Sequence, residues 1–444
     1  MTKGHAIDVR PLSGNPPPEL LPAELFERPH FALLESSLGG RYTIAAWEPR
    51  EVLEAHAGSD FLKELGKRIE AADPVDDASL PFAGGWIGFL GYELYDEILP
   101  KVPSRPVALL PKAFFAFYES FYLYDHLKKQ AFAVSPTGKG GPPPWPAELA
   151  RRPAATCRES PSGAQTRSSA TPADPLSRSL YVNGVARVKE LIASGDCYQV
   201  NLSQKFETPV SQPPYEIYRR LRETSPSPYA SYLNPGDAQI LSSSPELFLE
   251  IDGRRAITRP IKGTRPRGDD APSDARLKEE LATSAKDRAE LLMITDLERN
   301  DLGRVCRPGS VRVSELRTVE SYPQVHHLVS TVEGEIAEGR GVVDVLKATF
   351  PGGSITGAPK IRAMQVIREL EPHAREVYCG AIGFVSLNGK AQFNVAIRTM
   401  VVKDGKAHYW SGAGIVADSD PDAEYEEILV KARGITRVLD VGTR

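Results

Sequence analysis

A single lysine, Lys262, stands in the middle of a short basic segment and could act as a nucleophilic amine. The segment covers residues 259–268, RPIKGTRPRG, and follows the strand-like run LFLEIDG. Pro260 restricts the backbone two residues before the lysine, and Gly263 lets another group approach closely on its other side. This arrangement would hold an amine at the edge of a strand and direct it into a cleft. An ordinary solvated basic loop is the alternative, and this segment alone favours it.

Four carboxylates occur in two pairs, each with the spacing of about one helical turn. Asp287 and Glu290 lie on one predicted helix, and Glu424 and Glu427 repeat the spacing on the last one. Residues three apart project from the same helix face. If the two helices converge, the acids form an oxygen-rich site that suits Mg²⁺ when water and substrate oxygens complete the coordination shell. Taken alone, each pair is better explained as a solvated helix face.

Two glycine-rich segments could bind an anion. The loop PGGSITGAPK runs into a predicted helix, where free backbone N–H groups and the helix dipole favour negative charge. The loop does not match GxxxxGK[ST], so nucleotide binding is not indicated. Arg398, in AIRTM, and the turn GAGIV would add a guanidinium and further N–H donors. For either of these alone, a structural role is the simpler interpretation.

Glu246 is a candidate general acid. It begins a strand in SSSPELFLE, after three serines and a proline, where partial burial would keep it protonated. His326 and His327 precede an apolar strand, and at least one of them should point inward. Such a histidine is more often a hydrogen-bonded core residue than a catalyst.

The elements that must position these residues alternate between helices and antiparallel-looking strand pairs. Helices are expected in DFLKELGKRIEAA, LYVNGVARVKELIASGD and DAEYEEILVKARGITRVLDV. FAGGWIGFLGYEL suggests a glycine-rich strand pair, and AFFAFYESFYLYDH suggests an aromatic strand that is apolar on both faces. The regular βαβ rhythm of a doubly wound sheet is missing, so an α+β fold with large sheets is predicted.

A change of composition divides the chain. Residues 135–179 are rich in Pro, Gly, Ser, Ala and Arg and contain hardly any large apolar residues, so a flexible linker is expected there. It separates an N-terminal segment, residues 1–134, from a catalytic domain, residues 180–444. The N-terminal segment shows no catalytic constellation.

The overall composition argues for a cytoplasmic enzyme with a small acidic ligand. The chain has 444 residues and a net charge of −4, which gives no sign of a nucleic-acid or membrane partner. Four cysteines are spread widely without a CxxC pair, which argues against structural zinc or disulfides. The N-terminus has no apolar leader-like run, and no apolar stretch approaches membrane-spanning length.

The content and order of these motifs resemble the chorismate-utilising enzymes. The matching segments are DCYQVNLSQ, SSSPELFLE, RPIKGTRPRG, SAKDRAELLMITDLERNDLGRV, HHLVS, FPGGSITGAPKIRAM, AIRT, GAGIVADSDPDAEYEE and the N-terminal LLES. They cover residues 180–437 densely and the N-terminal half loosely. The resemblance implies one α+β unit in which two large, mostly antiparallel sheets pack on each other with helices outside. The N-terminal segment would add strands to both halves.

Within this family, PIKGT around Lys262 is similar to the aminodeoxychorismate synthases, whose lysine is a covalent nucleophile. Anthranilate synthases usually have PIAGT, but TRPRG and LLES are common among them, so they remain the alternative. Gln199 takes the place of the water-activating lysine of isochorismate and salicylate synthases, and an amide cannot act as that base. A non-catalytic module that binds chorismate or an amino acid is a third possibility, which the intact motifs disfavour.

The resemblance also implies a role for each candidate residue. Mg²⁺ would be held by Glu290 and Glu427, with Asp287 and Glu424 acting directly or through water. Lys262 would attack the substrate while Glu246 protonates its leaving hydroxyl, and His327 and Thr264 would support the ring. The substrate would be bound by Arg398, Ser354, Ile355, Thr356, Gly357, Gly412, Ala413, Gly414 and Lys431. Like charge from Arg259, Arg265 and the metal is expected to lower the pKa of Lys262.

The implied partners are chorismate, ammonia and a separate glutamine amidotransferase subunit, because the chain encodes no such domain. The product would be 4-amino-4-deoxychorismate, on the route to 4-aminobenzoate and folate. A second pocket resembles the one that binds tryptophan in relatives. Its residues here are Ser36, Arg41, Tyr42, Pro228 and Tyr229.

Overall fold

The computed structural model describes residues 6–38, 40–56, 58–137 and 175–439. The greater part of the predicted linker, residues 138–174, lies outside the described residues. Its two ends do not: residues 135 and 136 complete a strand, and residues 175–179 begin a helix.

One antiparallel sheet of the described chain contains 11 strands, in the spatial order β1-β8-β7-β3-β2-β10-β11-β20-β21-β9-β17. Their bounds are β1 Ile7–Pro11, β2 Ala32–Glu35, β3 Tyr42–Ala46, β7 Phe121–Asp125, β8 Gln130–Pro136, β9 Gln199–Pro209, β10 Tyr229–Leu233, β11 Gln239–Ser244, β17 Gly357–Ala358, β20 Thr399–Lys403 and β21 Lys406–Ile415. We call it sheet A.

A second antiparallel sheet, sheet B, has the order β14-β16-β13-β12-β19-β18-β5-β6-β4, and β15 also pairs with β16. Its bounds are β4 Glu51–Glu54, β5 Gly85–Leu90, β6 Ala113–Tyr118, β12 Leu247–Asp252, β13 Arg255–Arg259, β14 Ile261–Pro266, β15 Arg312–Ser321, β16 Val325–Glu335, β18 Ala381–Ser386 and β19 Lys390–Val395. Strands from the N-terminal segment extend both sheets, as the resemblance implies.

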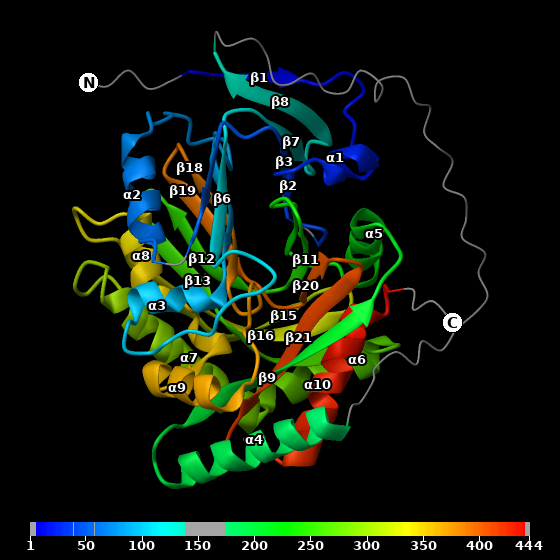
Figure 1. The fold of residues 1–444 in the computed structure, drawn as a ribbon, viewed down its shortest axis with the longest axis vertical. Helices are drawn as coiled ribbons and strands as arrows, with labels where there is room; N and C mark the ends of the chain where they lie inside the picture. The colour runs from blue at the N-terminus through cyan, green and yellow to red at the C-terminus, as the bar shows by residue number, and fades with distance from the viewer. Residues whose placement is uncertain (1–5, 39, 57, 138–174, 440–444) are drawn as a thin grey trace, which may run out of the picture.

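Helices pack on the outer faces of the two sheets (Figure 1). They are α1 Ala23–Glu27, α2 Phe61–Ala71, α3 Tyr95–Ile98, α4 Pro175–Ala193, α5 Pro214–Thr224, α6 Ala271–Thr283, α7 Ala285–Gly303, α8 Val342–Thr349, α9 Lys360–Leu370 and α10 Pro421–Thr436, with 3-10 turns η1 Pro18–Leu20, η2 Tyr92–Leu94 and η3 Gly353–Ile355. Helices α4, α5, α9 and α10 contact sheet A, whereas α6 and α7 contact sheet B. The layered α+β prediction is confirmed.

The largest apolar core joins side chains from both sheets, for example Ile240 and Trp410 of sheet A with Phe89 and Phe393 of sheet B. A second core fills the space between sheet A and its helices, with Tyr409 as one member. Burial on both faces explains why these strands are apolar throughout rather than alternating.

Two predicted strand assignments are wrong. FAGGWIGFLGYEL forms the single strand β5, followed by η2 and α3, because the chain turns into a helix at Gly91. AFFAFYESFYLYDH forms two strands, β6 in sheet B and β7 in sheet A. The polar pair between them marks the point where the chain passes from one sheet to the other.

Candidate active site

Lys262 lies on β14 at the edge of sheet B, as its sequence context predicts. Its Nζ atom donates a hydrogen bond to the carbonyl oxygen of Ser354, at 3.1 Å. Gly263 has φ +81°, and a β-carbon built there would stand 2.8 Å from Cγ of Asp287. The glycine therefore lets α7 approach the strand that carries the lysine.

Burial lowers the pKa of Lys262, and nearby Lys431 lowers it further. Glu290, Glu246 and Glu427 act in the opposite direction, but burial dominates. The predicted lowering of the Lys262 pKa is therefore found. Its main cause is burial and not, as predicted, the charge of Arg259 and Arg265.

The two arginines near Lys262 are neutralised by carboxylates. Arg259 forms an ion pair with Glu320, and Arg265 pairs with Glu280 at 2.8 Å and with Asp287 at 3.1 Å. Their positive charges are therefore compensated and do not act on Lys262.

Glu246 immediately precedes β12 and its side chain is buried, with the residue 4% exposed. Burial raises its pKa to about 7, although the Ser354 side chain, the Lys262 amine and the Ile261 N–H each oppose the shift. A carboxyl with a pKa near neutrality can both give and take a proton, as general acid catalysis requires. The predicted environment of Glu246 therefore agrees with the structure.

Glu298, on α7, is a second buried acid near Glu246 that the motifs did not indicate. Its Oε2 accepts a hydrogen bond of 2.6 Å from Thr258, and its Cγ stands 3.5 Å from a β-carbon built on Gly353. Burial raises its pKa to about 8, and Glu246 contributes in the same direction. A buried and an exposed glutamate look alike in a helical sequence, so the sequence alone could not indicate that Glu298 is buried.

The predicted metal ligands come from two helices, α7 and α10, whose acids act electrostatically on Lys262 and on each other. Glu290 of α7 interacts electrostatically with Glu424 of α10, and both Glu290 and Glu427 act on Lys262. Burial raises the pKa of Glu290. Among the described residues, however, no three acidic, histidine or cysteine side chains stand close enough to hold a metal by themselves.

Three of the four predicted metal ligands are engaged by other side chains. Asp287 pairs with Arg265, and Glu424 accepts a hydrogen bond of 2.6 Å from Ser419. Glu427 pairs with Lys431 at 2.7 Å. The donors are all carboxylate oxygens, which suit Mg²⁺, but substrate or water oxygens must supply the rest of the coordination shell.

Arg398 and His327 line one small cavity, together with Pro228 and Tyr322. No carboxylate of the described chain forms an ion pair with Arg398, and burial lowers its pKa. Burial and the arginine lower the pKa of His327 to about 4. His327 is therefore neutral at pH 7, and its Nδ1 lies 2.8 Å from Oγ1 of Thr264. An uncompensated guanidinium beside a neutral imidazole suits an anionic ligand with a polar ring.

Glycines 412 and 414 of β21 bring backbone to the same region. A β-carbon on Gly414 would meet the Gln199 amide at 2.1 Å and stand 3.6 Å from Lys262 Nζ. Both amide atoms of the fully buried Gln199 lack a hydrogen-bond partner among the described residues. A β-carbon built on Gly412 would stand 3.0 Å from the Tyr378 hydroxyl, which is the nearest side-chain atom. Sequence reasoning missed Tyr378, which lies in the turn that precedes β18 and belongs to none of the recognised motifs.

The glycine-rich loop supplies Ser354, Ile355, Thr356 and Gly357, which are all buried. Thr356 donates through Oγ1 to the Gly352 carbonyl at 2.9 Å, and Gly357 pairs with Val200 of β9. Ser354 is the member that reaches both Lys262 and Glu246. The predicted binding loop therefore borders the lysine.

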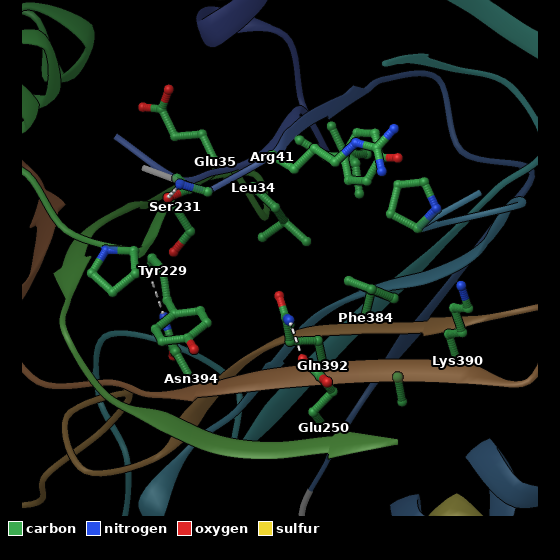
Figure 2. Close-up of a pocket in the computed structure, with 18 of the residues that line it drawn as sticks. Leu34, Glu35, Arg41, Tyr229, Ser231, Glu250, Phe384, Lys390, Gln392 and Asn394 are labelled. Carbon is green, nitrogen blue, oxygen red and sulfur yellow. Dashed lines mark hydrogen bonds between the residues drawn. The ribbon is translucent and has the colours of Figure 1, made fainter. Parts of the chain in front are cut away.

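A separate cavity of about 520 Å³ lies between the sheets. Figure 2 shows its lining, with Arg41 and Ser231 on one side and Phe384 and Gln392 on the other. This volume lies within the range of small-molecule binding sites. All of the residues predicted for a tryptophan pocket line it, namely Ser36, Arg41, Tyr42, Pro228 and Tyr229.

Lys262, the buried Glu246 and the acids of α7 and α10 that act on the lysine form one candidate active site, and comparison with known proteins identifies the class. The family of chorismate binding enzymes matches residues 30–437, and the chain belongs to it.

Curated relatives include aminodeoxychorismate synthase component 1 of Bacillus subtilis, 39% identical over 93% of this chain and 92% of the relative. Anthranilate synthase component 1 of Streptomyces coelicolor is 43% identical over 85% and 77%. The crystal structure of anthranilate synthase component I from Streptococcus pneumoniae superposes with TM-score 0.75 at 33% identity, covering 90% of this chain and 93% of that one.

None of the helices in the described residues is long and apolar enough to span a membrane.

Proposed function

We propose that this chain is the chorismate-binding component of an aminodeoxychorismate synthase, which replaces the C4 hydroxyl of chorismate with an amino group. The observation that carries the proposal is the position of Lys262. Its amine is held by the Ser354 carbonyl, its pKa is lowered by burial, and Glu246 lies beside it. A lowered pKa increases the fraction of the amine that is neutral, which is its nucleophilic form.

The described residues would bind chorismate through complementary charge. Arg398 offers an uncompensated guanidinium, and residues 412–414, which the structure places in β21 rather than in the expected turn, and the loop at residues 354–357 offer backbone donors. Tyr378, whose hydroxyl lies at Gly412, adds a donor to the same wall. The carboxylates of the substrate would accept hydrogen bonds from these groups, which would place the ring beside Lys262.

The reaction would proceed in two displacements. Lys262 Nζ forms a bond to C2 while the C4–O bond breaks, and Glu246 gives its proton to the departing hydroxyl, which leaves as water. Ammonia then bonds to C4, the C2–N bond breaks, and Lys262 leaves as the free amine. The surplus proton of the new amino group returns to Glu246. His327 and Thr264, hydrogen-bonded to each other, would support the ring during both steps.

Mg²⁺ fits the oxygen donors of Glu290 and Glu427, with Glu424 and Asp287 as direct or water-mediated ligands. When bound, it would neutralise the ring carboxylate of chorismate and withdraw charge from the ring. The raised pKa of Glu290 supports this assignment, since an unbalanced carboxylate favours a nearby cation.

The partners proposed for this reaction are ammonia and a glutamine amidotransferase subunit that would supply it, in the cytoplasm. The cavity between the sheets is proposed to bind tryptophan. Its lining offers the Glu250 carboxylate for an amino group and the Ser231 hydroxyl for a further hydrogen bond, whereas Arg41 is paired with Asp125 at 3.0 Å. Whether the ligand regulates the enzyme or supports its structure is a separate question from the chemistry at Lys262.

Anthranilate synthase is the second candidate, because relatives of that name match at comparable identity. In that reaction the amino group would enter at C2, the atom that we assign to Lys262. The lysine is therefore the residue on which the choice between the two functions depends.

The test is ammonia-dependent consumption of chorismate by Lys262→Ala in the full chain. We expect turnover to fall at least about 100-fold, as loss of a covalent catalyst requires. The exposed Lys278→Ala is the matched control and should retain turnover. Full activity of Lys262→Ala would contradict covalent catalysis by this lysine.

A further inference from the structure

Arg375 is an arginine buried behind the glycine-rich loop, 1% exposed. Its Nε and Nη2 donate to the two carboxylate oxygens of Glu371, at 2.9 and 2.7 Å. Nη2 also donates to the Asn201 carbonyl at 2.6 Å, and Nη1 donates to the Ile355 carbonyl at 3.0 Å. The ring of Tyr92 stacks on the guanidinium at 4.7 Å. Every face of this cation is therefore occupied by the protein.

These hydrogen bonds join three separate elements at one point. Glu371 follows α9, Asn201 lies on β9, and Ile355 ends η3. Asn201 strengthens the junction, because its Nδ2 donates to the Ile355 carbonyl at 3.0 Å and its N–H donates to Thr356 at 2.9 Å. The loop is consequently held at the residue that directly follows Ser354.

Ser354 is the loop residue that contacts the reactive lysine. Its carbonyl oxygen accepts one N–H from Lys262 at 3.1 Å. A peptide carbonyl cannot remove a proton from an amine, so this hydrogen bond orients the amine and leaves its lone pair free. The direction of that lone pair therefore depends on where the loop holds the Ser354 carbonyl.

We propose that Arg375 is a positioning residue, which fixes the Ser354 carbonyl through Ile355 and so orients the Lys262 amine for attack. The proposal rests on the proposed function, in which Lys262 is the nucleophile. A planar guanidinium suits this task because it donates in several fixed directions at once, which a lysine ammonium cannot do. The N-terminal segment takes part through Tyr92 and through Glu93, which accepts from the Arg375 N–H at 2.8 Å.

The experiment measures the accessibility of Lys262 without any substrate. The full chain is treated with acetic anhydride, and the acetylation rate at Lys262 is measured by mass spectrometry relative to the exposed Lys278. Arg375→Lys keeps a cation opposite Glu371, which avoids an uncompensated buried carboxylate. We expect Lys262 to be acetylated about tenfold faster in this variant, since losing a hydrogen bond from a charged group loosens the loop by about that factor.

The matched control is Arg222→Lys, which changes a partly buried arginine, paired with Glu35 at 2.8 Å. Arg222 does not hold the loop, so the Lys262 rate should stay within about twofold of the wild type. The kcat for chorismate should fall in Arg375→Lys while the Mg²⁺ concentration that gives half-maximal turnover is retained, because the acids lie on α7 and α10. If Arg375 had a purely structural role, the variant would be less stable, but its kcat would not fall separately from its metal dependence.

Circular dichroism establishes whether Arg375→Lys is folded. If it is not, Asn201→Ala removes the other side-chain donor to the Ile355 carbonyl at a smaller cost, and the Lys262 rate should still rise. An unchanged rate in a folded variant would overturn the proposal. Because acetylation needs neither chorismate nor ammonia, failure of this proposal and failure of the proposed function are distinguishable.

Discussion

Lys262, on β14, and Glu246, directly before β12, both lie next to Ser354. The amine donates to the Ser354 carbonyl at 3.1 Å, and the carboxyl lies beside the Ser354 side chain. The two groups also act on each other, since each stabilises the charged form of the other. A nucleophile and a proton donor thus face the same residue of the glycine-rich loop, which is the arrangement that displacement of a hydroxyl requires.

Replacing Glu246 with Gln should remove the proton donor and keep the shape of the site. We expect kcat to fall by about 10²- to 10⁴-fold, the usual contribution of general acid catalysis. Glu279→Gln, the same change at an exposed position of α6, is the matched control. A Glu246→Gln variant with wild-type kcat would exclude Glu246 as the acid.

The pH profile should report the same group. Glu246 has a pKa raised to about 7, so its protonated form is present below that pH and is lost as pH rises. The rate limited by proton donation should therefore decline above about pH 7. The measurement is kcat between pH 5.5 and 9, and a rate that keeps rising through this range would contradict the assignment.

Glu298→Gln should change how stability depends on pH. Burial raises the pKa of Glu298 to about 8, so the folded chain holds this proton between the unfolded value and pH 8. The carboxyl therefore contributes stability that is fully present below about pH 4.5 and is lost as pH rises to about 8.

Glutamine does not titrate, so the Glu298→Gln variant does not lose this stability as pH rises. Its free energy of unfolding relative to the wild type should therefore increase from pH 5 to pH 8. The gain should be on the order of 3 kcal/mol. Urea denaturation at both pH values measures it, and a difference that does not change with pH would contradict the burial of a protonated Glu298.

Arg398→Gln should weaken binding of chorismate more than it slows the chemical step. Loss of a charge-assisted hydrogen bond to a carboxylate predicts a KM about 10- to 100-fold higher. The exposed Arg312→Gln serves as the control. A normal KM in Arg398→Gln would remove this residue from the binding site.

Tryptophan should bind in the cavity between the sheets. The buried Ser231 hydroxyl lines this cavity and has no hydrogen-bond partner among the described residues, so a ligand could satisfy it. Calorimetric titration should give one site per chain, and Ser231→Ala should weaken it about three- to tenfold. A flat trace with the wild-type chain would reject the assignment.

The pattern of helices and strand pairs predicted an α+β fold, and the family resemblance added the packing of two large sheets. The residues that flank Lys262 could be recognised because they form a short local motif. The proline and glycine flanking Lys262 and the strand that begins after Glu246 are local features, and both have the predicted conformations. Sheet membership was less accessible. Whether β6 and β7 belong to one sheet or two depends on pairing with β5 and β3, which are distant in sequence.

The electrostatics of the site could not be read from the sequence for the same reason. Arg259 and Arg265 stand near Lys262 in the chain, but their partners Glu320 and Glu280 are brought to them by folding. Arg375 and Glu298 show the reverse case. Each occupies an ordinary position in its segment, and burial behind the glycine-rich loop gives each its role.

The most direct test of the account is the product formed from chorismate, Mg²⁺ and ammonium by the purified chain. Chromatography with and without an added aminodeoxychorismate lyase separates the two candidate reactions. If Lys262 directs the amino group to C4, 4-aminobenzoate appears only when the lyase is present. Anthranilate formed without the lyase would contradict the account and would assign the chain to the anthranilate synthases.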